Sequence, residues 1–138
     1  MSWPERIEGG KTSEALISQI DIFRSLGELI NSRIPRESAP DSENYMDALL
    51  GIDAVGRKWV VEQSYNHTLS VRDKEWKYIE PNNGPTGVPW VPEIESGNSS
   101  KPQLYRLSDD YHEKNNLAES HKDKVMEFMN ILKEVREK

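Results

Sequence analysis

The chain has 138 residues, a formal net charge of −6 and no cysteine, and its mean hydropathy is −0.81. This length fits one domain, or one compact domain with an appendage. No Lys/Arg block exceeds two residues, so the sequence offers no basic face for nucleic acid. No apolar run reaches the length of about 18 residues that a membrane span needs, and the polar first residues lead us to expect no signal peptide in this sequence. The lack of cysteine excludes disulfides, thiolate chemistry and Cys-ligated zinc.

Residues 1–12 are polar and rich in Pro and Gly, and they predict a lead-in loop. An apolar stripe at three- and four-residue spacing then predicts a helix at about 13–31, with Thr12 or Ser13 as its N-cap. Asp21 lies beside this stripe, where a carboxylate needs a partner. The stripe consists of Ile17, Ile20, Phe23, Leu26, Leu29 and Ile30.

Two proline-containing breaks precede a second, shorter helix, which we predict at about 42–50. Asp41 or Ser42 is its expected N-cap, and Gly51 stands where helices often end in a left-handed residue.

The following sequence has strand character. Four β-rich segments predict strands at 58–63, 68–72, 75–79 and 103–107. Asp73-Lys74 predicts a tight hairpin, and residues 81–102 form a long segment without periodicity.

A final apolar stripe predicts a helix at about 119–136, with Ser120 near its start. The expected fold class is α+β: a small four-stranded antiparallel sheet packed by a C-terminal helix, preceded by one long and one short helix.

Three runs of residues resemble sequence patterns of one protein family. Residues 3–7 (WPERI) and 18–23 (SQIDIF) resemble a "WPG+I" loop leading into an "SQIDL" helix. Residues 69–79 (LSVRDKEWKYI) are similar to the "LxxRxGxWKYI" hairpin. Residues 102–118 (PQLYRLSDDYHEKNNLA) resemble the "QLYDLSxDPxExxNLA" signature. These are patterns of type I sulfatases, and the chain resembles that family. It departs from the patterns at Lys74-Glu75 and Tyr111-His112, which both lie in connections, and this leaves the local turn geometry open.

The resemblance implies that residues 1–56 are the tail end of a sulfatase catalytic domain and that 57–138 are the C-terminal subdomain. The resemblance also implies that the parent protein hydrolyses sulfate monoesters. We expect its substrates to be carbohydrates and its location to be the periplasm or the outside of the cell. The formylglycine nucleophile and the calcium ion of the family are expected only in the missing N-terminal part. This chain should therefore bind no cofactor and catalyse nothing alone. Its expected partner is the catalytic domain, and self-association through the exposed helix 13–31 is a further expectation.

Three arrangements imitate catalytic or metal sites. The run Ser38–Glu43 opens like C/S-x-P-S/A-x-R, the motif that carries the nucleophile in the sulfatase family. Glu43 stands where this motif has arginine, so we interpret the run as a proline turn before a capped helix. Asp109-Asp110, even with Asp21, offers too few converging oxygens for a hard cation and predicts a turn. Ser70, His67 and Asp73 are common residues whose strand positions do not favour a triad.

The candidate substrate-binding residues are Asn66, His67 and Trp90. Asn66 and His67 lie in the connection between the first two strands, which is either a solvated loop or a contributor to the parent's substrate cleft. Trp90, in a proline-rich loop, is predicted to anchor on the catalytic domain, and the alternative is a sugar-stacking platform. The competing function is a stand-alone carbohydrate-binding or interaction module, which would be monomeric and would bury helix 13–31 against its own sheet.

Overall fold

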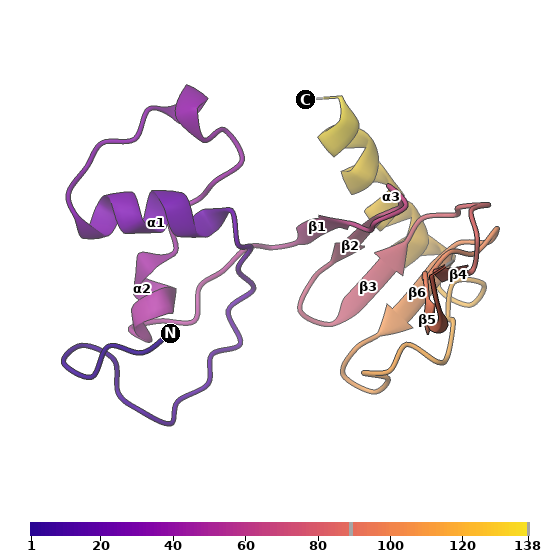
Figure 1. Cartoon of the computed structure of the whole chain (residues 1–138), viewed down its shortest axis with the longest axis horizontal. Helices are drawn as coiled ribbons and strands as arrows, with labels where there is room; N and C mark the ends of the chain where they lie inside the picture. The colour runs from indigo at the N-terminus through magenta and orange to yellow at the C-terminus, as the bar shows by residue number, and fades with distance from the viewer. Residues whose placement is uncertain (89, 138) are drawn as a thin grey trace. The chain divides into compact units, whose positions relative to one another are not determined.

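A computed structural model describes residues 1–88 and 90–137 and divides the chain into two compact units, Met1–Lys58 and Trp59–Lys138 (Figure 1). Each unit has its own secondary structure. The assignment of residues 1–56 to a catalytic domain stays a prediction.

The first unit contains three helical segments: α1 spans Asp21–Leu29, the 3-10 helix η1 spans Arg36–Ser38, and α2 spans Met46–Leu50. The prediction that the first helix begins near residue 13 is wrong. It begins after Ile20, and no side chain caps it.

An extended segment replaces the missing helical turns. The amide of Arg57 donates a hydrogen bond of 2.7 Å to the carbonyl oxygen of Leu16. A Cβ atom on Gly56 would lie 2.5 Å from the same oxygen, so this close backbone contact requires glycine at position 56. Ile17 therefore fits the helical spacing of apolar residues although it lies before the helix. The spacing alone cannot show at which residue the helix begins.

The second helix is also shorter than expected, because Tyr45 and not Asp41 or Ser42 precedes it. The Oδ1 atom of Asn44 accepts a hydrogen bond of 3.0 Å from the amide of Met46. Gly51 ends α2 with φ = 75°, which confirms the predicted left-handed residue.

Helix α1 turns small and polar residues inward and leaves apolar ones outside. Its buried residues are Asp21, Ser25 and Gly27. We refer to the exposed set as the α1 apolar face, which consists of Ile20, Ile22, Phe23, Leu26 and Ile30. A contiguous apolar surface of this kind indicates contact with another protein surface.

The second unit is built on an antiparallel sheet in the order β1-β2-β3-β6. These strands span Val60–Gln63, Leu69–Arg72, Trp76–Ile79 and Gln103–Arg106. Together with the C-terminal helix, the sheet confirms the predicted α+β class.

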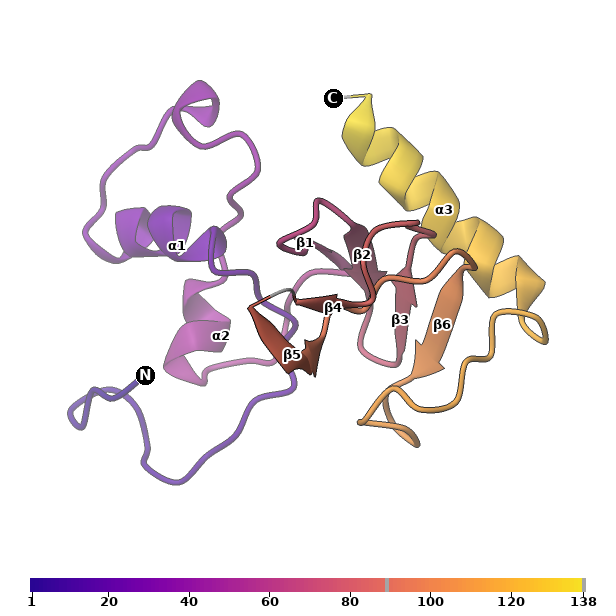
Figure 2. The same cartoon turned by 45° about the vertical axis from the view of Figure 1, so that its right-hand side comes forward.

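Helix α3, Lys122–Arg136, covers one face of this sheet (Figures 1 and 2). Val71 lies opposite Tyr78 in the register, and Tyr78 lies opposite Leu104. These three side chains form the core with the α3 residues Phe128 and Leu132. Since strand neighbours alternate between faces, Arg72 and Lys77 project to the opposite face of the sheet.

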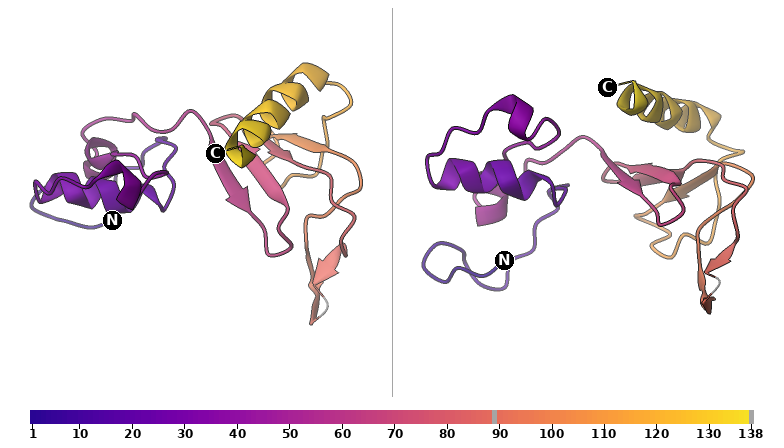
Figure 3. Two further views of the ribbon diagram at one scale, coloured as in Figure 1. Left: turned by 90° about the horizontal axis from the view of Figure 1, so that it is seen from above. Right: turned by 45° about the horizontal axis from the view of Figure 1, so that its top comes forward.

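The segment 81–102 contains a two-stranded ribbon that periodicity did not reveal. Strand β4, Gly87–Val88, pairs with β5, Val91–Glu95, in an antiparallel arrangement. The ribbon extends away from the four-stranded sheet in both views of Figure 3. Within the described ranges, no helix combines the length and apolar character needed to cross a membrane.

Candidate functional site

Two exposed aromatic side chains meet at the loops of the second unit. Tyr65 belongs to the β1–β2 connection, and Trp90 lies at the turn between β4 and β5. Their ring centroids are 5.4 Å apart and their planes are inclined by 89°, an edge-to-face arrangement that aromatic quadrupoles favour. Tyr65 is 72% exposed and Trp90 is 64% exposed. The structure thus brings Trp90 to the same loop that holds Asn66 and His67.

The β1–β2 connection has a tightly defined backbone. The amide of Ser64 donates to the carbonyl of Thr68 at 2.9 Å, and the amide of His67 donates to the carbonyl of Ser64 at 3.0 Å. His67 has φ = 62°, a left-handed conformation that residues with a side chain rarely adopt. Its imidazole is exposed, whereas Asn66 is half-buried.

A buried polar network fastens the 81–102 segment to this connection. The hydroxyl of Thr68 donates to Oδ1 of Asn98 at 2.9 Å and accepts from Nδ2 of Asn82 at 2.7 Å. Nδ2 of Asn98 donates to the carbonyl of Pro85 at 2.9 Å. Thr68 and Asn98 are both buried, so the bond between them is shielded from competing water. The network holds the bases of the two aromatic loops together.

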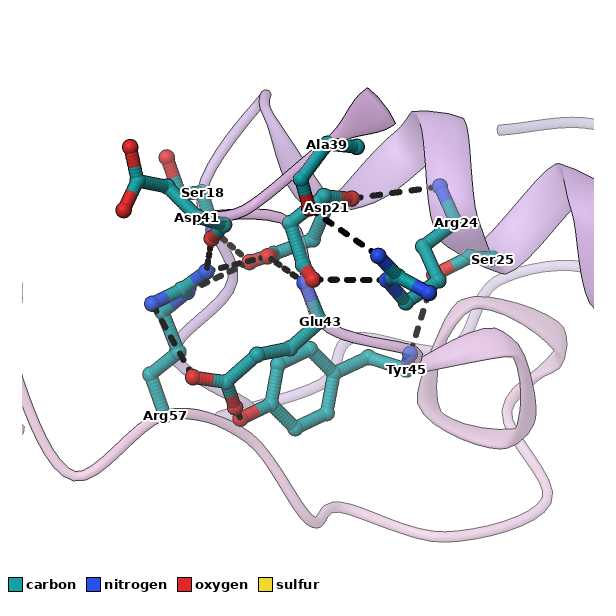
Figure 4. Close-up of polar contacts among 10 residues, drawn as sticks. Ser18, Asp21, Arg24, Ser25, Ala39, Asp41, Glu43, Tyr45 and Arg57 are labelled. Carbon is teal, nitrogen blue, oxygen red and sulfur yellow. Dashed lines mark hydrogen bonds and ion pairs between the residues drawn. The ribbon is translucent and has the colours of Figure 1, made fainter. Parts of the chain in front are cut away.

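The first unit has a polar centre of its own, formed by Asp21 and Arg57 (Figure 4). Asp21 accepts two hydrogen bonds from Arg57, 2.7 Å from Nε and 2.5 Å from Nη2. The backbone amides of Ser18 and Glu43 each donate to the same carboxylate at 2.9 Å. Asp21 is completely buried, so the sequence-based expectation that it needs a partner is confirmed.

A second arginine completes this centre. Arg24 donates hydrogen bonds to the carbonyl oxygens of Ile34, Ala39 and Ser42 at 2.8–3.1 Å. The hydroxyl of Ser25 accepts from the amide of Tyr45 at 2.9 Å. The loop between α1 and α2 is therefore held by side chains that α1 supplies (Figure 4).

The titration behaviour of this centre fits a structural role. Burial disfavours the charged form of Asp21, but hydrogen bonds from Arg57, Glu43 and Ser18 outweigh it and hold the pKa of the carboxyl below its usual value. Burial and a hydrogen bond to the Glu43 carboxylate raise the pKa of Tyr45 to about 12. Asp21 thus stays ionised and Tyr45 stays protonated near neutral pH, and neither is suited to proton transfer there.

Comparison with known proteins identifies the relatives of this arrangement. No protein-family profile matches the sequence. Over 134 residues, 97% of the chain, the sequence is 42% identical to the N-acetylgalactosamine-6-O-sulfatase of Bacteroides thetaiotaomicron, of which it covers 26%. It is 29% identical over 84% of its length to the ulvan-active sulfatase of Formosa agariphila, of which it covers 27%.

A solved structure concerned with the metabolism of multiple glycosaminoglycans by Bacteroides thetaiotaomicron matches with a TM-score of 0.92 and 41% identity. The alignment covers 99% of this chain and 28% of that one. The chain is a sulfatase C-terminal segment. It spans about a quarter of the length of the relatives it matches.

Among residues 1–88 and 90–137 of the sulfatase segment, no three His, Asp or Glu side chains are grouped as a metal site requires. The calcium and formylglycine that the family implies belong to the catalytic domain. Asp110 instead accepts hydrogen bonds from the amides of Lys114 and Asn115, at 3.0 and 2.7 Å, which confirms the turn predicted there.

In the apparent triad of Ser70, His67 and Asp73, the Asp73 carboxylate bonds to other groups. This carboxylate accepts hydrogen bonds from the amides of Glu75 and Trp76 and from Nζ of Lys124, at 2.6–2.9 Å. It closes the predicted β2–β3 hairpin. In the motif-like run, Ser38 lies in η1 and Glu43 contacts Arg57 and Tyr45.

Sequence reasoning missed two residues of these sites. Tyr65 stands in the same short connection as His67, but an aromatic residue in a polar turn gave no indication of contact with Trp90. Arg57 is 36 positions from Asp21, so no local pattern joined the pair.

Replacing His67 with glycine separates backbone conformation from imidazole chemistry in the sulfatase segment. Glycine adopts positive φ without strain, so we expect the free energy of unfolding to stay unchanged or rise by up to about 1 kcal/mol. Chemical denaturation measures this effect. His67→Asn is the matched variant, since asparagine also tolerates this conformation. A loss of more than about 1 kcal/mol in both variants would mean that the imidazole itself holds the loop.

Proposed function

We propose that this chain serves as the C-terminal part of a sulfatase that hydrolyses sulfate monoesters on carbohydrates. It packs on the catalytic domain and shapes one side of the substrate cleft. The match over 97% of the chain to only 26% of a sulfatase carries this proposal. By the same argument the chain does not turn over sulfate esters alone, because the nucleophile and the calcium ligands reside in the remaining three-quarters of such a protein.

The proposed substrate class is a sulfated amino sugar. The relative that is 42% identical acts, by its name, on 6-O-sulfated N-acetylgalactosamine. Asn66, His67 and Trp90 stay the proposed substrate-contacting residues, and the edge-to-face contact of Trp90 with Tyr65 supports a common surface for them.

The α1 apolar face supports packing against a catalytic domain. It would leave water on docking, and burial of apolar side chains is the main driving force of such association.

Fragment complementation tests the proposal. The purified chain is assayed on an aryl sulfate and on N-acetylgalactosamine 6-sulfate, with and without calcium. It is then assayed with the preceding three-quarters of the Bacteroides thetaiotaomicron relative. We expect no turnover by the chain alone and sulfate release on mixing.

Two results would contradict this function. Turnover by the chain alone would reveal a nucleophile that the described residues do not supply. Sugar binding by a monomeric chain, without any complementation, would favour the alternative of a stand-alone carbohydrate-binding module.

A further inference from the structure

We propose that Tyr65 and Trp90 form a stacking platform for a sugar ring, with Asn66 and His67 as hydrogen-bonding groups at its border. The inference rests on the proposed function for the class of ligand, a carbohydrate. It goes further by adding Tyr65 as a binding residue and by giving Trp90 a stacking role, in place of the anchor on the catalytic domain that its proline-rich loop predicts.

The aromatic pair has the exposure that a ligand contact requires. About two-thirds or more of each side chain is open, at 72% for Tyr65 and 64% for Trp90. The rings meet at 89°, so an edge of one ring covers only part of the other, and substantial ring area remains free. Each side chain combines an apolar ring with a polar tip, the phenol hydroxyl or the indole N–H. A pyranose has the complementary character, with C–H faces and hydroxyl edges.

The position of the pair is fixed by structure beneath it. The Thr68 hydroxyl links Asn82 and Asn98 in bonds of 2.7 and 2.9 Å. The backbone bonds of Ser64 hold the turn that presents Tyr65. A site arranged before the ligand arrives loses less conformational entropy on binding than a mobile one.

The chemistry of the surroundings favours a sugar over a protein surface. The α1 apolar face is mainly aliphatic, and burial of such side chains drives packing on another protein. The aromatic pair differs, because polar Ser64, Asn66 and His67 share its loop. Such polar groups would be left without water at a dry protein contact but can bond to hydroxyl groups of a carbohydrate.

Direct binding by the full chain tests the platform. A tetrasaccharide containing N-acetylgalactosamine is titrated in its 6-sulfated and desulfated forms, and the tryptophan indole N–H signals are followed by NMR. We expect weak binding, with Kd on the order of 1 mM, and a shift of the Trp90 signal. Stacking acts on the ring, so the desulfated form should bind within about threefold of the sulfated one.

Alanine variants identify the residues that contribute. We expect Trp90→Ala and Tyr65→Ala to weaken binding about tenfold each, equivalent to about 1.4 kcal/mol. Tyr111→Ala is the matched control, since Tyr111 is another exposed aromatic of this unit that touches a histidine ring. It should leave the affinity unchanged. Circular dichroism confirms that the variants fold, as expected for substitutions of exposed side chains.

Three results would overturn the platform: no saturable shift in the unaltered chain at millimolar sugar, equal weakening by Tyr111→Ala, or unchanged affinity in Trp90→Ala. If the alanine variants bind sugar normally but complement the catalytic fragment poorly, Trp90 is a protein anchor. The sugar titration needs no hydrolysis. A failure of complementation alone would contradict the proposed function and leave the platform standing.

Discussion

Replacing Asp21 with asparagine is expected to lower the free energy of unfolding of the first unit by about 3–5 kcal/mol. The amide keeps the shape of the carboxylate but removes its charge. Arg57, whose side chain is only 12% exposed, would then keep only its longer pair with the exposed Glu43, at 3.3 Å. The amides of Ser18 and Glu43 would also lose a charged acceptor. Urea denaturation, with hydrogen exchange of the α1 amides as the local probe, measures the loss.

A matched control separates this centre from ordinary surface pairs. Lys11 and Glu8 form an ion pair in the same unit, but both side chains are exposed. Glu8→Gln should therefore change the free energy of unfolding by less than about 1 kcal/mol. The double variant Asp21→Asn with Arg57→Met should lose less than the sum of its single variants, because it leaves no unpaired charge. Equal losses in Glu8→Gln and Asp21→Asn would contradict a special role of the buried pair.

The same centre predicts an acid limit of stability. The folded-state pKa of Asp21 lies below its usual value, so the unfolded chain takes up this proton first as pH falls. The stabilisation is fully present above about pH 4, the ordinary range of an aspartate, and is lost as pH falls through the folded pKa. The Asp21→Asn variant should lack this part of the acid dependence.

The sequence predicted the second unit better than the first, and the reason is physical. The strands β2 and β3 each bury one core residue, Val71 or Tyr78, between half-buried neighbours, and the apolar stripe of α3 supplies the buried Val125, Phe128 and Leu132, so the local patterns report on burial. In the first unit the apolar pattern does not identify the buried side of the helix. The stripe around α1 is exposed in this chain, and the buried face consists of Asp21, Ser25 and Gly27.

Long-range contacts account for the remaining differences. Leu16 stays extended because its carbonyl accepts from Arg57, 41 positions along the chain. The β4–β5 ribbon lies in a segment rich in Pro and Gly, where no alternation identifies a strand. The contact of Tyr65 with Trp90 joins two loops whose composition resembles any solvated turn. The periodicities and the family resemblance together supplied the fold class, but neither supplied these contacts.

The α1 apolar face leads to the second large effect, on association with the catalytic fragment. Phe23→Gln combined with Leu26→Gln should weaken complementation at least about 100-fold, since burial of such a side chain contributes about 1.5–3 kcal/mol. Phe23 and Leu26 are 56% and 45% exposed, and glutamine is a good helix former. The stability of the isolated chain should therefore change little. Titration of the catalytic fragment with the variant, followed by sulfate release, measures the affinity.

Met126→Gln with Met129→Gln provides the control for this effect. These two methionines are similarly exposed apolar residues on another helix, α3. If docking uses the α1 apolar face, the α3 variant should complement as well as the unaltered chain does. Sedimentation of the chain alone adds a second test, because any self-association through this face should decrease in the α1 variant only. Equal loss of complementation in both variants would mean that any added glutamine on an exposed helix weakens association. The α1 apolar face would then have no specific partner.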